Sequence, residues 1–315
     1  RGMRERDGRE RVGLTTNGGT TWTTKLASAL PASALISDIH GKDATAAFMV
    51  TAPTGSAGSA NALWKTTDSG TTWTKTSGVF SNNSFGNIVY FWDNNTGIVI
   101  GDPINNKYEM YKTTDGGNTW SSLATAPTAD SSEEYGYVGG KVGFENHLWL
   151  TSNTGRVLHT GDRGVTWSSF QAPIEDFAGA GSSGSLAFTS ATHGVIVDSN
   201  DLIWITENAG VNWNIEQAND YFTSDLKYIP NTNTLISSGI RVESSQYVGT
   251  SYSHDGGKTW TIIEKGIAQR GTIGAFDCNS VWVGGYTADA TGKEGIFKLD
   301  APIPGCSLGI TEQVN

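Results

Sequence analysis

An eight-residue segment that recurs six times constrains the fold of this chain more than any other feature. One copy reads Thr113-Thr-Asp-Gly-Gly-Asn-Thr-Trp120, and every copy has Ser or Thr first, Asp or Asn third, Gly fifth, Thr or Asn seventh and Trp last. Successive copies place their tryptophans 51, 47, 47, 46 and 47 residues apart. A fixed period of this length indicates an array built by repeating one supersecondary unit.

Each copy of this segment, which we call the box, lies between two short apolar stretches and is therefore predicted to be the turn of a β-hairpin. The Asp or Asn is expected to accept hydrogen bonds from backbone N–H groups two residues on, and the Gly to adopt a backbone angle closed to other residues. The Trp is expected to fill the gap between neighbouring repeats. Because Asn replaces Asp in two copies, we interpret the boxes as structural rather than catalytic or metal-binding. The residues concerned are Asn17, Asp68, Asp115, Asp162, Asn208, Asp255, Trp22, Trp73, Trp120, Trp167, Trp213 and Trp260.

The stretches between boxes supply up to four short strands per repeat, separated by turn residues, as in the blades of a propeller. We predict an all-β fold, a single β-propeller of four-stranded blades. Seven blades with an incomplete first blade are favoured, because the last repeat has a third strand but no box; six blades remain the alternative, and a linear solenoid is the competing architecture. Residues 1–11 are predicted to be a disordered or processed start, residues 12–303 the propeller, and residues 304–315 a C-terminal linker.

Composition excludes several classes of protein. The 315 residues include 40 glycines and 11 tryptophans, only 17% are charged, and the net charge is −10. An acidic chain is a poor partner for nucleic acid or anionic lipid. No apolar run approaches the ~20 residues that span a bilayer, so we expect no membrane insertion.

Two cysteines, Cys278 and Cys306, both lie in the last repeat. Spacing alone leaves open whether they are two free thiols or a disulfide that ties the C-terminal segment to the last blade. A disulfide would indicate an extracytoplasmic protein.

The boxes resemble the Asp-box, or BNR repeat, of sialidase-like propellers. The stretches 97–101 and 280–284, which read Gly-Ile-Val-Ile-Gly and Ser-Val-Trp-Val-Gly, are similar to the photosystem II assembly factor-like propellers. The final residues, Leu308-Gly-Ile-Thr-Glu-Gln-Val-Asn315, resemble the linker before the sorting domain of secreted Bacteroidetes proteins. These resemblances imply a secreted or cell-surface bacterial protein exported by the type IX system.

Two enzyme classes share the Asp-box. Sialidases clamp a carboxylate with three arginines and carry a Phe/Tyr-Arg-Ile-Pro segment, which this chain lacks. Beyond its N-terminal cluster the chain has only Arg156, Arg163, Arg241 and Arg270, so sialidase activity is not expected. Xyloglucan-cleaving enzymes place two aspartates in a cleft between two propellers, which one propeller cannot build. Any glycosidase needs a suitably spaced carboxylate pair, for which the candidates are Asp38, Asp102, Glu134 and Asp225.

We interpret these four carboxylates as structural in the first place, because no set of nucleophile, base and orienting residue is readable. No cofactor or metal motif is found. The favoured function is binding of a glycan or a surface protein, with Tyr135, Tyr221, Arg270 and Tyr286 as contact residues. The alternatives are a glycoside hydrolase, sialidase-like or xyloglucanase-like, and a structural component of a surface assembly.

Overall fold

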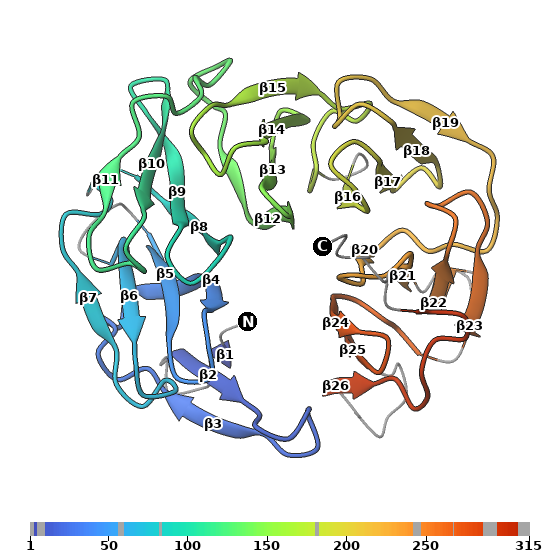
Figure 1. Cartoon of the computed structure of the whole chain (residues 1–315), viewed down its shortest axis with the longest axis horizontal. Helices are drawn as coiled ribbons and strands as arrows, with labels where there is room; N and C mark the ends of the chain where they lie inside the picture. Colours follow the sequence, from blue (N-terminus) through green and yellow to red (C-terminus); the bar gives the residue numbers. More distant parts are fainter. Residues whose placement is uncertain are drawn as a thin grey trace, which may run out of the picture. The chain divides into compact units, whose positions relative to one another are not determined.

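The computed structural model describes residues 3–4, 10–55, 60–81, 84–179, 183–241, 247–266, 268–285 and 295–307. In this part of the chain every regular element is a β-strand, and no helix is long and apolar enough to cross a membrane. The chain divides into two compact units, Arg1–Ser169 and Phe170–Asn315, which are described separately (Figure 1).

The first unit contains one three-stranded sheet followed by four-stranded sheets, each an antiparallel meander. Their strands, in chain order, are β1 (Met3–Arg4), β2 (Glu10–Leu14) and β3 (Thr23–Leu26); β4 (Ala34–Gly41), β5 (Ala47–Pro53), β6 (Ala62–Thr66) and β7 (Thr74–Thr76); β8 (Gly86–Phe91), β9 (Gly97–Ile104), β10 (Lys107–Thr113) and β11 (Ser121–Ser122); and β12 (Gly136–Phe144), β13 (His147–Ser152), β14 (Arg156–Thr160) and β15 (Ser168–Gln171).

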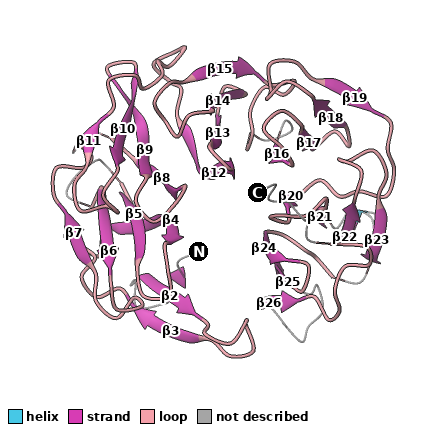
Figure 2. Ribbon diagram, viewed as in Figure 1, coloured by secondary structure: helices cyan, strands magenta, loops and turns pink. Residues whose placement is uncertain are grey.

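The second unit contains two four-stranded sheets and a final sheet of three strands (Figure 2). Its strands are β16 (Gly184–Phe188), β17 (Gly194–Asp198), β18 (Ile203–Thr206) and β19 (Asn214–Glu216); β20 (Asp225–Tyr228), β21 (Leu235–Ile240), β22 (Val248–Ser253) and β23 (Thr261–Lys265); and β24 (Ile273–Asp277), β25 (Ser280–Gly285) and β26 (Gly295–Lys298).

These sheets confirm the prediction of an all-β propeller fold with four-stranded blades. The number of blades in a closed ring stays a prediction. The first sheet includes Met3–Arg4 paired with residues 10–11, so the segment 1–11 contributes strand residues to the fold.

The box turns are held by one repeated set of hydrogen bonds. In the copy of the third sheet, the hydroxyl of Thr113 donates to Asp115 at 2.8 Å and accepts the N–H of Gly117 at 2.9 Å. One carboxylate oxygen of Asp115 accepts the N–H groups of Asn118 and Thr119, three and four residues on. The expectation of an acceptor contact two residues on was therefore wrong by one to two positions, because the turn is wider than a simple Asx turn.

The fifth residue of the box must be glycine for two reasons. Gly117 has a φ of +77°, in the left-handed region, and a Cβ on it would come within 2.2 Å of the ring of Phe48 in the preceding sheet. The fourth position is also left-handed, and three copies tolerate a side chain there, at Ser69, Arg163 and Ala209.

Box tryptophans occupy the space between neighbouring sheets, as the sequence predicted. Trp73 packs with Val12 of the first sheet, and Trp167 packs against Ile98 and Met110 of the third. In the second unit Trp260 joins a core cluster with Val195 and Ile203, residues of the sheet before its own. The core of each unit therefore lies between sheets. Trp22 is the exception and is 47% exposed.

Candidate functional site

Two of the four candidate carboxylates link neighbouring sheets through the backbone. Asp38 on β4 accepts the N–H of Val89 on β8 at 2.9 Å and pairs with Lys141. Asp225 on β20 accepts the N–H of Ile273 on β24 at 2.7 Å. A carboxylate that satisfies a donor on the next sheet stabilises the packing of the two sheets. These contacts support the structural interpretation of both residues.

Asp102, the third candidate, lies at the end of β9 and is mostly buried. It accepts hydrogen bonds from the Asn87 side chain at 2.6 Å and from the N–H of Gly136 at 3.3 Å. Burial raises the pKa of Asp102 to about 6, and these two hydrogen bonds oppose that rise.

Glu134, the fourth candidate, is buried in an ion pair. Its carboxylate lies 2.6 Å from Arg156 Nη1 and accepts the hydroxyl of Tyr108 at 3.1 Å. Arg156 also contacts Asp130 and the hydroxyl of Ser169. Removing one partner of such a pair leaves an uncompensated buried charge, so loss of either partner alone would destabilise the fold, and the buried carboxylate is closed to a substrate.

No hydrogen bond found in the described part of the chain joins two of these four carboxylates. Asp102 and Glu134 do share one neighbour, Tyr108, because burial and then the charges of both carboxylates raise the pKa of its hydroxyl. Within the same residues no group of three or more His, Cys, Asp or Glu side chains is arranged to hold a metal.

The predicted contact residues Tyr135 and Tyr221 differ in how far their rings are exposed to a ligand. Tyr135 is 43% exposed and lies edge-on to Tyr137. Tyr221 packs beside Trp260, donates its hydroxyl to the carbonyl of Asp201, and has its pKa raised to about 12, chiefly by burial. Tyr221 therefore supports the core rather than presenting a ring to a ligand. Tyr286 lies outside the described residues.

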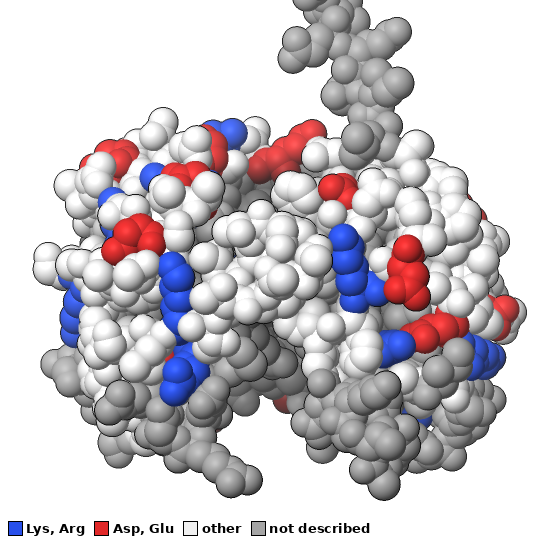
Figure 3. All heavy atoms as spheres, turned by 90° about the horizontal axis from the view of Figure 1, so that it is seen from below, with Lys and Arg blue, Asp and Glu red and all other residues white. Residues whose placement is uncertain are grey.

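Charged side chains do not form a single-sign patch on the face shown in Figure 3, where acidic and basic residues are interspersed over a mostly uncharged surface. This distribution does not single out a region for an ionic partner.

The second unit contains a cavity of about 380 Å³ between its last two sheets. This volume is at the low end of the range of small-ligand pockets. Its walls are largely apolar and come from β21, β23, β25, β26 and the segment after β26, with Ile236, Ile263, Val281, Val283, Phe297 and Leu299 among the lining residues.

Arg270 is the principal polar group of this cavity. Its Nε and Nη2 atoms pair with Glu264, the latter at 3.1 Å, and its guanidinium lies 4.5 Å from the centre of the Phe297 ring. The Nη1 atom is buried and has no hydrogen-bond partner among the described residues. A buried donor without a partner is costly, and because this atom has almost no accessible surface it does not face the open part of the cavity.

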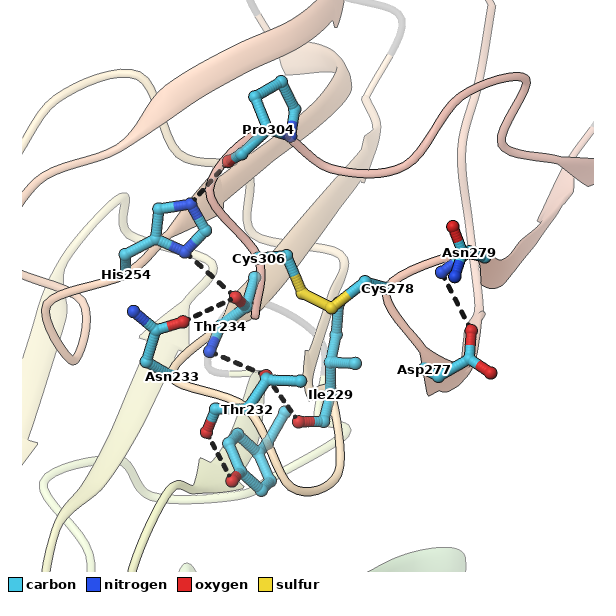
Figure 4. The surroundings of a disulfide bond; sticks show 11 residues. Ile229, Thr232, Asn233, Thr234, His254, Asp277, Cys278, Asn279, Pro304 and Cys306 are labelled. Carbon is cyan, nitrogen blue, oxygen red and sulfur yellow. Dashed lines mark hydrogen bonds between the residues drawn. A yellow bond between two sulfur atoms is a disulfide. The ribbon is translucent and has the colours of Figure 1, made fainter. Parts of the chain in front are cut away.

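A disulfide fixes the C-terminal wall of the cavity (Figure 4). Cys278, in the turn after β24, is bonded to Cys306 with a Cα–Cα distance of 5.8 Å. Between them Ile303 is buried and donates its N–H to the carbonyl of Cys278 at 3.3 Å, while His254 contacts the carbonyl of Pro304 at 2.8 Å. The segment that closes the cavity is thus tied to both neighbouring sheets.

Sequence reasoning named Arg270 but missed the cavity around it. Glu264, Phe297 and the apolar wall belong to no motif. A usable signal was the missing box after the last sheet, because box tryptophans such as Trp73, Trp167 and Trp260 fill gaps between sheets.

Comparison with known proteins supports the fold. No protein-family model and no curated protein sequence matches the chain. Among solved structures, Ycf48 bound to a D1 peptide is similar with a TM-score of 0.51 and 20% identity, over 81% of this chain and 78% of that one. Ycf48 from Cyanidioschyzon merolae has a TM-score of 0.44 and 16% identity, over 84% and 94% of the two chains. A GH74 xyloglucanase from Xanthomonas campestris has a TM-score of 0.46 and 12% identity, over 97% of this chain and 55% of that one.

Proposed function

We propose that this protein is a non-catalytic binding module whose ligand is a protein segment. The observation that carries the proposal is the largely apolar cavity of the second unit, whose lining includes the ion pair of Arg270 and Glu264. An apolar wall with a few polar groups is typical of a binding site. A propeller similar in fold has been solved with a peptide bound, but this likeness concerns the fold, so the cavity carries the argument.

Selection from a random peptide library displayed on phage tests this function. Peptides should be enriched on the native protein, and the double variant Arg270→Gln with Glu264→Gln, which removes both charges together, should bind them at least about tenfold more weakly, corresponding to one lost charge-assisted hydrogen bond. The matched control is Arg241→Gln, since Arg241 pairs with Asp201 away from the cavity and its loss should leave binding unchanged. Failure to enrich any peptide, together with glycans bound on an array, would assign the module to carbohydrate instead.

An extracytoplasmic location is part of the same proposal. The bond between Cys278 and Cys306 favours an oxidising compartment, and the resemblance of residues 308–315 to a sorting linker favours export to the cell surface. Labelling of intact cells with an antibody to the protein tests this location; signal only after lysis would contradict it.

Glycoside hydrolysis is a second candidate, favoured by one observation. Asp102 has a pKa raised to about 6, and a raised pKa is the property of the acid in a glycosidase pair. If Asp102 is that acid, hydrolysis on a polysaccharide panel should fall by at least about a hundredfold in Asp102→Asn, the usual contribution of general acid catalysis. Two results would remove this candidate: no hydrolysis by the native protein, or equal hydrolysis by the native protein and Asp102→Asn.

A further inference from the structure

The last sheet lacks the hairpin that completes the other sheets of the second unit. Strand β26 pairs only with β25 among the described residues, whereas β18 and β22 each continue through a box into a fourth strand. The residues after β26 contain no box and no Trp. Among the described residues, the last sheet therefore has no fourth strand beside β26.

The cavity occupies the position that a box tryptophan fills one sheet earlier. Ile203 and Thr250 each lie three residues before the first box residue, and Val195 and Ile236 each pair with the residue just before it. Val195 and Ile203, which pack with Trp260, therefore correspond to Ile236 and Thr250. Both of the latter line the cavity. The wall positions that enclose an indole ring between β17 and β22 thus line the cavity between β21 and β26, which Ile303 and Leu299 fill in part.

Along the strand edge beside this cavity, backbone groups point away from β25. The N–H of Leu299 donates to Val281 of β25 at 3.0 Å, and backbone direction alternates along an antiparallel strand. The N–H and C=O groups of Ile296 and Lys298 consequently point away from β25, while the side chain of Phe297 lines the cavity. The Ile296 side chain is 58% exposed on the opposite face.

We propose that an extended peptide binds here as a fourth strand of the last sheet, with an aromatic side chain in the cavity. Its backbone pairs with Ile296 and Lys298. Strand addition of this kind draws affinity from main-chain hydrogen bonds and specificity from a side-chain pocket. The inference rests on the proposed function and specifies its ligand: a segment with a large aromatic residue at the start of a β-strand.

The chain itself supplies the probe. Residues 259–265, Thr-Trp-Thr-Ile-Ile-Glu-Lys, form the box tryptophan and fourth strand of the preceding sheet. A labelled synthetic peptide of this sequence is titrated with the whole protein by fluorescence anisotropy, beside a control peptide in which Ala replaces the Trp. We expect saturable binding of the first peptide and at least about tenfold weaker binding of the second, because burial of the indole is the main apolar gain.

Two variants at one position test the strand edge. Ile296→Pro removes one outward N–H, and proline is tolerated where the N–H faces away from the sheet, so peptide affinity should fall at least about tenfold while the melting temperature stays close to that of the native protein. Ile296→Thr keeps the N–H and should bind within about threefold of the native protein, since an edge substitution of this kind alters packing only slightly.

The outcomes separate this inference from the proposed function. Equal binding of both peptides, or full binding to Ile296→Pro, would overturn strand addition while peptides selected from the library still supported a peptide-binding module. No binding of the box peptide overturns the inference as well. A dimer of the free protein that Ile296→Pro dissociates would assign the edge to a second copy of the chain and would equally overturn it.

Discussion

The hydroxyl residue that opens each box makes the same hydrogen bond in every copy. In five copies it is Thr and in one Ser253, and its hydroxyl always accepts the N–H of the box glycine, at 2.8 to 3.0 Å. The third box residue is held in its ionised form where it is an aspartate. In the second copy, hydroxyl and backbone N–H donors lower the pKa of Asp68 to about 2. The box is thus a closed hydrogen-bond network.

Thr113→Val should destabilise the protein by about 1–3 kcal/mol, the cost of leaving a buried N–H group unpaired. Thr113 is buried and its hydroxyl serves Asp115 and Gly117. Urea denaturation measures the loss. The control is Thr113→Ser, which should be nearly neutral because Ser253 makes the same bond to Gly257 at 2.9 Å; equal losses in the two variants would show that the hydroxyl is not responsible.

At the scale of the elements, neighbouring sheets are joined by carboxylate hydrogen bonds as well as by tryptophan packing. Asp38 and Asp225 each reach from the first strand of one sheet to the backbone of the next, and Asp102 does the same from β9 to β12. Asp102 differs because burial raises its pKa to about 6. A group that binds its proton more tightly in the folded state is most stabilising when it is protonated.

The pH dependence of Asp102→Asn should therefore have a defined sign. The unfolded chain has an ordinary aspartate pKa near 3.9, so between about pH 4 and pH 6 the folded native protein holds more protons and its stability falls as pH rises. The Asn variant lacks this loss and should gain up to about 3 kcal/mol relative to the native protein across that range. Denaturant midpoints at pH 4, 5, 6 and 7 measure the difference, and a gap that does not vary with pH would contradict it.

His40 is expected to change the pH dependence of stability with the opposite sign to Asp102. Burial, helped by the charge of Lys141, lowers its pKa to about 4, so the unfolded chain takes up the proton first and stability is lost as pH falls from about 6.5 to 4. In His40→Phe, whose ring suits the neighbouring Tyr90 and Phe91, this acid loss should be smaller. Acid-titrated unfolding of the two proteins compares them, and identical curves would contradict the sign.

Elements could be predicted from sequence wherever the box repeats, because turn chemistry and strand alternation act locally. The pairing of Asp225 with the N–H of Ile273 could not, since it joins residues 48 positions apart through the packing of two sheets. Arg270 was predicted as a contact residue, but its neighbours Glu264 and Phe297 carry no motif. Asp102 and Glu134 looked alike in the sequence and differ in the structure, because only Glu134 has an arginine partner.

At the scale of the whole molecule, each unit is stabilised by filled gaps between sheets, and the second unit has one gap that remains partly empty. A single covalent bond holds the wall of that gap, joining residues 28 positions apart. The double variant Cys278→Ser with Cys306→Ser should lower the free energy of unfolding by about 2–4 kcal/mol, measured by urea denaturation. Reductant should weaken the native protein equally and leave the variant unchanged; a native protein indifferent to reductant would contradict the role of the bond.

The central claim is that the edge of β26 and the cavity beside it receive a peptide strand. The most direct measurement is a crystal structure of the whole protein with the peptide copied from residues 259–265. The account predicts density for an antiparallel strand bonded to Ile296 and Lys298, with the peptide's indole ring against Ile236 and Val281. A peptide bound elsewhere, with the edge of β26 unpaired and the cavity unchanged, would contradict it.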